Sequence, residues 1–147
     1  MRPALPLLIG LMPLMMGAAL PPDAVRPGYW ETTNKVLSPI SSTKTENRCV
    51  SAKEVARFMM GPSNHIYTCV YPSQSAAGGR IAFTGHCESR KGRKVEISGK
   101  GDYTPTTLHL VVNFTTALGP LQISGKASTD ARRIGDVCPP GAVGAEH

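Results

Sequence analysis

The chain has 147 residues, which suits one ordinary domain and is too short for two. A hydrophobic fraction of 41% excludes a chain too polar to fold, and 15 Gly and 13 Pro predict many turns without the glycine period of collagen. The formal net charge is +6, and nothing in the composition or the motifs amounts to a catalytic signature.

Residues 1–19 have the pattern of a secretory signal peptide. Arg2 gives a positive start, the apolar run from Leu5 to Met16 carries no charge, and small residues precede an expected cleavage after Ala19. A retained membrane anchor is the alternative, but the run is short for a spanning helix and is interrupted by proline. We therefore expect export from the cytoplasm.

All four cysteines follow this segment, and an even number in an exported chain predicts disulfides. Cys69 and Cys87 are equidistant from Gly78 in a glycine-containing turn, so a hairpin centred there places them opposite each other. Cys49 and Cys138 then pair by elimination.

A metal site is the competing interpretation of the cysteines. His65 lies four residues before Cys69, and His86 adjoins Cys87. Structural zinc sites usually supply close ligand pairs such as Cys-x2-Cys, and no such pair occurs here. We expect no metal or cofactor ligands.

The mature chain should begin with an extended lead over residues 20–27. Alternating side chains predict a strand from Tyr29 to Val36, with Trp30 as the core anchor. A polar run from Ser42 to Val50 predicts a second strand at a sheet edge or with a wet face.

One short helix is expected after the second strand. Ser51-Ala52-Lys53-Glu54 is a capping-box pattern, and Gly61-Pro62 ends the helix near Met60. Five more strands are predicted: Ile66 to Tyr71, Arg80 to Glu88, Lys94 to Tyr103, Thr107 to Thr116 and Leu121 to Thr129.

These patterns predict a mainly β fold for a single domain at residues 28–138. Short turns and one apolar face per strand favour a curled antiparallel meander sheet or small barrel with one short helix. A two-sheet sandwich is the alternative. Residues 139–147 lack an apolar pattern and are expected to form a flexible tail.

The motifs together resemble the exported bacterial proteins grouped as domain of unknown function 3617, from about Pro27 to Cys138. They are Pro27-Gly28-Tyr29-Trp30-Glu31, Cys49-Val50-Ser51 before the helix, paired Cys69 and Cys87, and Arg132-Arg133-Ile134-Gly135 before Cys138. The chain departs from the usual form in having Tyr29 for an aliphatic residue and two residues, Asp136 and Val137, before the last cysteine. The resemblance implies a bacterial protein of the periplasm or secreted fraction, and it brings no activity and no catalytic residue.

Catalytic residues are not expected. The nucleophile motif Gly-x-Ser-x-Gly is absent, the cysteines should be oxidised, and His86 and His109 fall on strand faces opposite the apolar sets. An uncharacterised hydrolase remains an alternative because a catalytic triad meets in space rather than in sequence.

The densest charge cluster comprises Arg90, Lys91, Arg93 and Lys94. It is either a solvated hairpin turn or a contact for an anionic lipid surface or polyanion. Nucleic acid is disfavoured because no aromatic residues lie between the basic ones to stack on bases.

We expect a non-enzymatic envelope protein that binds a small apolar or amphiphilic ligand through the concave face of its sheet. The alternative is a structural or interaction protein of the envelope that uses the basic cluster or a polar edge strand.

Overall fold

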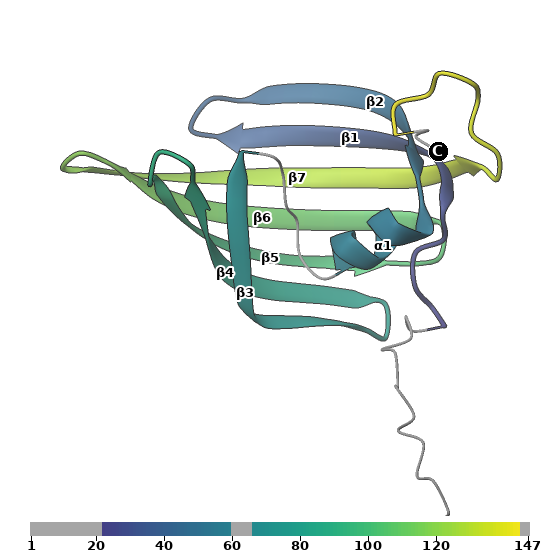
Figure 1. The fold of residues 1–147 in the computed structure, drawn as a ribbon, viewed down its shortest axis with the longest axis horizontal. Coiled ribbons are helices and arrows are strands. Elements are labelled where there is room, and N and C mark those ends of the chain that lie inside the picture. The colour runs from purple at the N-terminus through teal and green to yellow at the C-terminus, as the bar shows by residue number, and fades with distance from the viewer. Residues whose placement is uncertain (1–21, 60–65, 145–147) are drawn as a thin grey trace, which may run out of the picture.

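The computed structural model describes residues 22–59 and 66–144 (Figure 1). The expected signal peptide at residues 1–19 lies outside the described residues, as do Gly61-Pro62 and His65. The elements are β1 (Gly28–Ser38), β2 (Ser42–Val50), α1 (Ala52–Met59), β3 (Tyr67–Ala77), β4 (Arg80–Ser89), β5 (Lys94–Tyr103), β6 (Thr107–Leu118) and β7 (Leu121–Gly135).

The strands form one antiparallel sheet in the order β2-β1-β7-β6-β5-β4-β3. Strands β3 to β7 make the expected meander, and the N-terminal hairpin of β1 and β2 adds to it through the pairing of β1 with β7. The curled meander with one helix is therefore confirmed.

The barrel and the two-sheet sandwich are wrong, because all seven strands share one sheet whose edges are β2 and β3. Helix α1 lies in the connection between these two edges, over the concave side of the sheet (Figure 1). Its Val55 and Met59 are buried there, so the apolar face is covered without closure of the sheet.

The core lies between α1 and the concave face. Trp30 is only 2% exposed, as expected of the core anchor. The other members of the cluster are Val25, Val55, Met59, Ile81, Phe83, Tyr103, Leu108 and Leu110. Strands β1, β4, β5 and β6 supply the buried strand residues of this cluster. Because successive side chains point to opposite faces of a sheet, β4 shows strictly alternating burial from Ile81 to Cys87.

The start of α1 has both hydrogen bonds of a capping box. The Glu54 amide donates to Ser51 Oγ at 3.2 Å, and the Ser51 amide donates to Glu54 Oε2 at 2.8 Å. Arg48 on β2 donates to the other carboxylate oxygen of Glu54 at 3.1 Å. The helix is thereby tied to the strand that precedes it.

The lead is more closely packed than expected. Val25 is buried in the core, and the Arg26 amide donates to the carbonyl oxygen of Pro105 at 3.0 Å. The Trp30 indole N–H donates to the carbonyl oxygen of Arg26 at 3.0 Å. The ordered domain therefore begins before Gly28, because the buried indole needs an acceptor that the lead supplies.

The expected tail is pinned to the sheet as far as Gly144. The Cys49 amide donates to the carbonyl oxygen of Val143 at 2.7 Å, and Arg48 and Val143 form a parallel bridge. Gly144 has φ +81°, a conformation that glycine adopts without strain, beside the carbonyl group of Cys49. Residues 139–144 are therefore held by backbone contacts with β2, and no apolar pattern in their sequence is needed.

Candidate functional site

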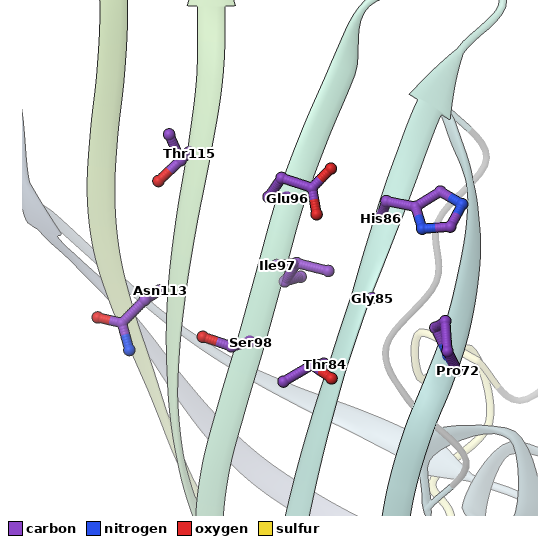
Figure 2. Close-up of a pocket in the computed structure, with 9 residues that line it drawn as sticks. All are labelled: Pro72, Thr84, Gly85, His86, Glu96, Ile97, Ser98, Asn113 and Thr115. Carbon is purple, nitrogen blue, oxygen red and sulfur yellow. The ribbon is translucent and has the colours of Figure 1, made fainter.

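Three hollows lie on the described surface, and they differ in chemistry. The first, of about 380 Å³, crosses β3 to β6 on the face directed away from α1 (Figure 2). It is lined by Pro72, Thr84, Gly85, His86, Glu96, Ile97, Ser98, Asn113 and Thr115. Figure 2 shows mostly polar side chains along the strands, with the apolar Ile97 and Pro72 among them, so this hollow is an open surface of mixed character.

The second hollow, of about 390 Å³, lies across β1, β7, β6 and the β5–β6 turn. His109 Nδ1 and Asp130 Oδ1 are 2.6 Å apart, and both side chains are about half exposed. Beside them Arg132 Nε donates to Glu31 Oε1 at 2.8 Å. The hydrogen bond from Arg132 lowers the pKa of Glu31, so this carboxylate is the charged partner of a surface ion pair.

The third hollow, of about 780 Å³, lies at the end of the sheet where the β4–β5 and β6–β7 turns meet the start of β3. We name it the hairpin-end hollow. It is lined by Ile66, Tyr67, Ser89, Arg90, Lys91, Gly92, Arg93, Ala117, Leu118 and Gly119.

The hairpin-end hollow combines apolar and basic side chains. Ile66 is 54% exposed and Leu118 is 42% exposed, while Arg90, Lys91 and Arg93 stand on the adjoining turn. The hollow therefore presents an apolar and a cationic surface side by side.

The charges of this turn are not neutralised by the described part of the chain. Across residues 22–59 and 66–144, the side chains of Arg90, Lys91, Arg93 and Lys94 form no ion pair. In contrast, Arg48, Arg132 and Arg133 each bind a carboxylate. The turn is therefore a local concentration of positive charge, in which Glu88, opposite Lys94 in the register, is the nearby carboxylate.

The backbone of the same turn is closed by its own hydrogen bonds. The Ser89 amide donates to the carbonyl oxygen of Arg93, and the Arg93 amide donates to Ser89 Oγ, at 2.9 and 3.0 Å. Gly92 has φ +78°, which the turn requires. The basic side chains thus project from an ordered turn.

The disulfides pair as the sequence predicts. Cys69 lies opposite Cys87 in the register of β3 and β4, with Cα atoms 4.0 Å apart. Cys49 on β2 is joined to Cys138 after β7, with Cα atoms 5.7 Å apart. Both bonds are compatible with an oxidising compartment outside the cytoplasm.

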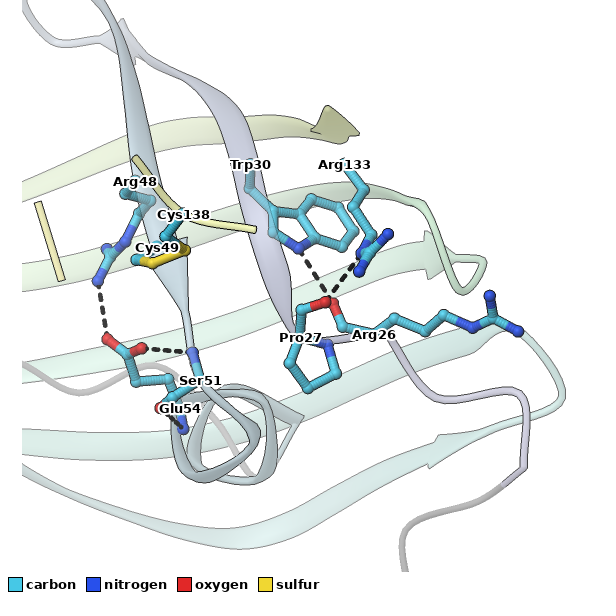
Figure 3. The surroundings of a disulfide bond; sticks show 9 residues. All are labelled: Arg26, Pro27, Trp30, Arg48, Cys49, Ser51, Glu54, Arg133 and Cys138. Carbon is cyan, nitrogen blue, oxygen red and sulfur yellow. Dashed lines mark hydrogen bonds and ion pairs between the residues drawn. A yellow bond between two sulfur atoms is a disulfide. The ribbon is translucent and has the colours of Figure 1, made fainter. Parts of the chain in front are cut away.

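The residues around the Cys49–Cys138 disulfide join elements of the fold to one another (Figure 3). Arg133 Nε donates to the carbonyl oxygen of Pro27 at 2.8 Å, next to the Trp30 indole that binds Arg26. These contacts tie the end of β7 to the lead, and Arg48–Glu54 ties β2 to α1 on the other side.

Side chains suited to catalysis or metal binding are not brought together in the described residues. No group of three His, Cys, Asp or Glu there is placed to hold a metal ion. His86 and His109 are exposed, as expected. The only histidine–carboxylate pair described, His109–Asp130, has no Ser or Thr hydroxyl hydrogen-bonded to it, so the hydrolase alternative gains no support.

The sequence singled out the basic cluster but not the apolar half of the hairpin-end hollow. Ile66 and Leu118 reach the same hollow only because the meander register puts the β4–β5 and β6–β7 turns at one end of the sheet. In a meander, every second turn lies at the same end of the sheet. Applying this rule to the predicted strands would have placed Ile66 and Leu118 beside the basic turn.

Within the described residues, no helix has the length and apolar character to cross a bilayer. The fold and its site define a class of protein: a curled antiparallel sheet stapled by two disulfides, with a basic and apolar hollow at one end. The chain belongs to the family described as "Protein of unknown function (DUF3617)", whose model matches residues 25–138. No curated protein and no solved structure matches the chain.

Proposed function

We propose that this protein is a non-enzymatic binding module of the bacterial cell envelope that holds an amphiphile with an anionic head in the hairpin-end hollow. The observation that carries the proposal is the lining of this hollow, where apolar Ile66 and Leu118 stand beside the unneutralised cations of Arg90, Lys91 and Arg93. An acyl chain and an anionic head need these two surfaces side by side.

The concave face under α1 is a poorer candidate for the ligand. Its space is filled by the protein's own side chains, with Trp30, Val55, Ile81 and Phe83 each at most 4% exposed. A ligand would have to displace packed side chains there, at a cost typical of core disruption. The ligand site expected on the concave face is therefore better placed in the hairpin-end hollow.

The energetics of the hollow favour an anion with an apolar chain. Each basic residue close to an anionic surface contributes about 1 kcal/mol. Burial of apolar surface adds roughly 25 cal/mol for each Å² removed from water. A neutral amphiphile would gain only the second contribution, so the charge of the head should determine selectivity.

The location is part of the proposal. The signal-peptide pattern of residues 1–19 and the two disulfides support an exported protein of the periplasm or the secreted fraction. Acyl amphiphiles with anionic heads are abundant at a bacterial envelope, so a ligand of this chemistry would be at hand.

Calorimetric titration with short-chain lysolipids below their micelle concentration tests the proposal. We expect an anionic lysophosphatidylglycerol to bind and the zwitterionic lysophosphatidylcholine of equal chain length to bind at least about tenfold more weakly. R90E/R93E should reduce anionic binding about tenfold or more, and L118S should weaken both ligands.

Two distant variants serve as controls. K53E reverses an exposed charge on α1, and V137S removes an apolar side chain that is 83% exposed at the opposite end of the sheet. Neither should change the affinity. Equal binding of both lysolipids, or equal loss in K53E and R90E/R93E, would refute the proposal.

A further inference from the structure

We propose that strand β2 is a self-pairing edge: two copies of the protein join their β2 strands antiparallel about a two-fold axis at Thr45. This inference concerns a different surface from the hairpin-end hollow and does not depend on ligand binding.

The two edges of the sheet differ in regularity. The pairing of β3 with β4 has a register shift between Val70 and Ser73, and Pro72 within it has no backbone N–H. Such features block the addition of a further strand. The pairing of β2 with β1 runs without interruption from Gly28–Val50 to Val36–Ser42. Only β2 thus offers a smooth ladder.

The outward groups of β2 can be assigned from its one outer contact. The Cys49 amide donates to Val143, on the side away from β1. Because backbone groups alternate along a strand, the amides and carbonyls of Thr43, Thr45 and Asn47 also face outward. In the described part of the chain, the outer side of β2 is paired only at Arg48 and Cys49.

A two-fold axis at Thr45 uses all of these groups. Thr45 then faces Thr45 of the second copy, and Thr43 faces its Asn47 as a hydrogen-bonded pair, as does Asn47 with its Thr43. The Thr33–Thr45 hydroxyl contact at 2.9 Å agrees with this assignment, because it marks Thr45 as a non-hydrogen-bonded position toward β1.

The charges of β2 are self-complementary in this register. Lys44 faces Glu46 of the second copy, and Glu46 faces its Lys44, in positions where side chains lie closest. An axis at Lys44 would instead set two lysines opposite each other, and an axis at Glu46 would set two glutamates opposite each other. An axis at Asn47 would need the outer side of Cys49, which Val143 occupies.

The existing contact of these two side chains is no obstacle. Lys44 Nζ lies 2.6 Å from Glu46 Oε2 within the strand, where the lysine side chain is 75% exposed and the glutamate side chain 28% exposed. An ion pair at the surface contributes little, so its exchange for pairs between copies costs little. A single strand pair buries less than the roughly 800 Å² per partner of a standard interface, so the dimer should be weak and concentration-dependent.

Charge exchange tests the register. Sedimentation velocity from about 1 μM to about 1 mM should show a monomer–dimer equilibrium for the wild-type protein. K44E and E46K should each weaken the dimer about tenfold, because each sets like charges opposite each other twice. The double variant K44E/E46K should restore it, and an equimolar mixture of the two single variants should form a mixed dimer.

A backbone test separates edge pairing from other interfaces. T45P removes an outward N–H that β1 does not use and should abolish the dimer, whereas T45A keeps the N–H and should retain it. Hydrogen exchange should show protection that increases with concentration at the amides of Thr43, Thr45 and Asn47.

Three results would overturn the proposal: a wild-type monomer throughout the concentration range, a dimer indifferent to both single charge reversals, or equal dimers in T45P and T45A. Circular dichroism identifies any variant that fails to fold. The mixed dimer of K44E with E46K uses the same two single variants, so its formation also shows that both are folded. If the wild-type protein dimerises as expected but binds no lysolipid, only the proposed function is refuted.

Discussion

Phe83 on β4 lies directly opposite Gly99 on β5, and its ring occupies the space where a side chain at residue 99 would begin. Closely spaced glycines inside a strand, as at Gly99-Lys100-Gly101, often mark a bulge or a bend. The register of β5 is continuous with both neighbours, so the missing side chain serves the packing of Phe83 instead.

G99A should therefore destabilise the protein by about 1 to 3 kcal/mol, as is usual for overpacking a core. Phe83 is only 4% exposed and has no room to retreat. Urea unfolding followed by the fluorescence of the single Trp measures the change. G135A is the control, since a Cβ at Gly135 meets its nearest atom at an ordinary 3.7 Å. Equal effects of the two substitutions would contradict the packing role.

Tyr103 should make the fold sensitive to alkali. Its side chain is 3% exposed, and burial, followed by the negative charge of Asp23, raises its pKa above the usual value of about 10. The folded state thus prefers the neutral phenol. The corresponding stability is complete below the usual pKa and is lost as the pH rises from there toward the higher pKa of the folded protein.

Y103F should remove part of this alkaline loss, because burial also raises the pKa of Tyr71. At neutral pH it should cost little, since the buried Tyr103 hydroxyl lies beside Asp23 without a well-formed hydrogen bond among the described residues. Thermal melts between about pH 7 and pH 11 measure both effects. A large destabilisation of Y103F at pH 7 would show that the hydroxyl is bonded in solution.

Glu31 should titrate below an ordinary glutamate. The hydrogen bond from Arg132 lowers its pKa, so the contribution of the pair to stability is present above the usual glutamate pKa and is lost as the pH falls through the lowered value. NMR titration of the Glu31 carboxyl group should show this shift, and R132Q should return the pKa toward normal. K126Q, which removes an exposed positive charge from the same strand, should leave the pKa of Glu31 lowered. An ordinary glutamate pKa for Glu31 in the wild-type protein would disprove the pair.

The two disulfides should contribute unequally. In the loop-entropy model the short Cys69–Cys87 closure is worth about 3 kcal/mol, and the Cys49–Cys138 closure, with a sequence separation of 89, about 4.5 kcal/mol. C49A/C138A should therefore lower the free energy of unfolding more than C69A/C87A does. Denaturant titrations of the two double variants compare them, and the opposite order would show that the hairpin clamp dominates.

Much of the fold follows from local patterns in the sequence. The strands at 42–50 and 94–103 have the predicted bounds, and the capping box marks the start of α1 to within one residue. These features depend on alternation and capping, which a short window of sequence contains.

Long-range features are less visible. The pairing of β1 with β7 joins segments about 100 residues apart, and no local pattern specifies it. The packing of the lead and of residues 139–144 also has no local pattern, because a single apolar residue, Val25, reaches the core and backbone groups of Arg26 and Val143 make the other contacts. For the same reason, the sequence showed the basic turn of the hairpin-end hollow without its apolar side.

The 89-residue span of the Cys49–Cys138 disulfide has a consequence for biogenesis. A polypeptide that is threaded from its N-terminus into an oxidising space presents Cys49 and then Cys69 long before Cys138. Oxidation in order of arrival would link the first two thiols wrongly. In such a space, early formation of the β3–β4 hairpin, which pairs Cys69 with Cys87, would leave Cys49 free for Cys138.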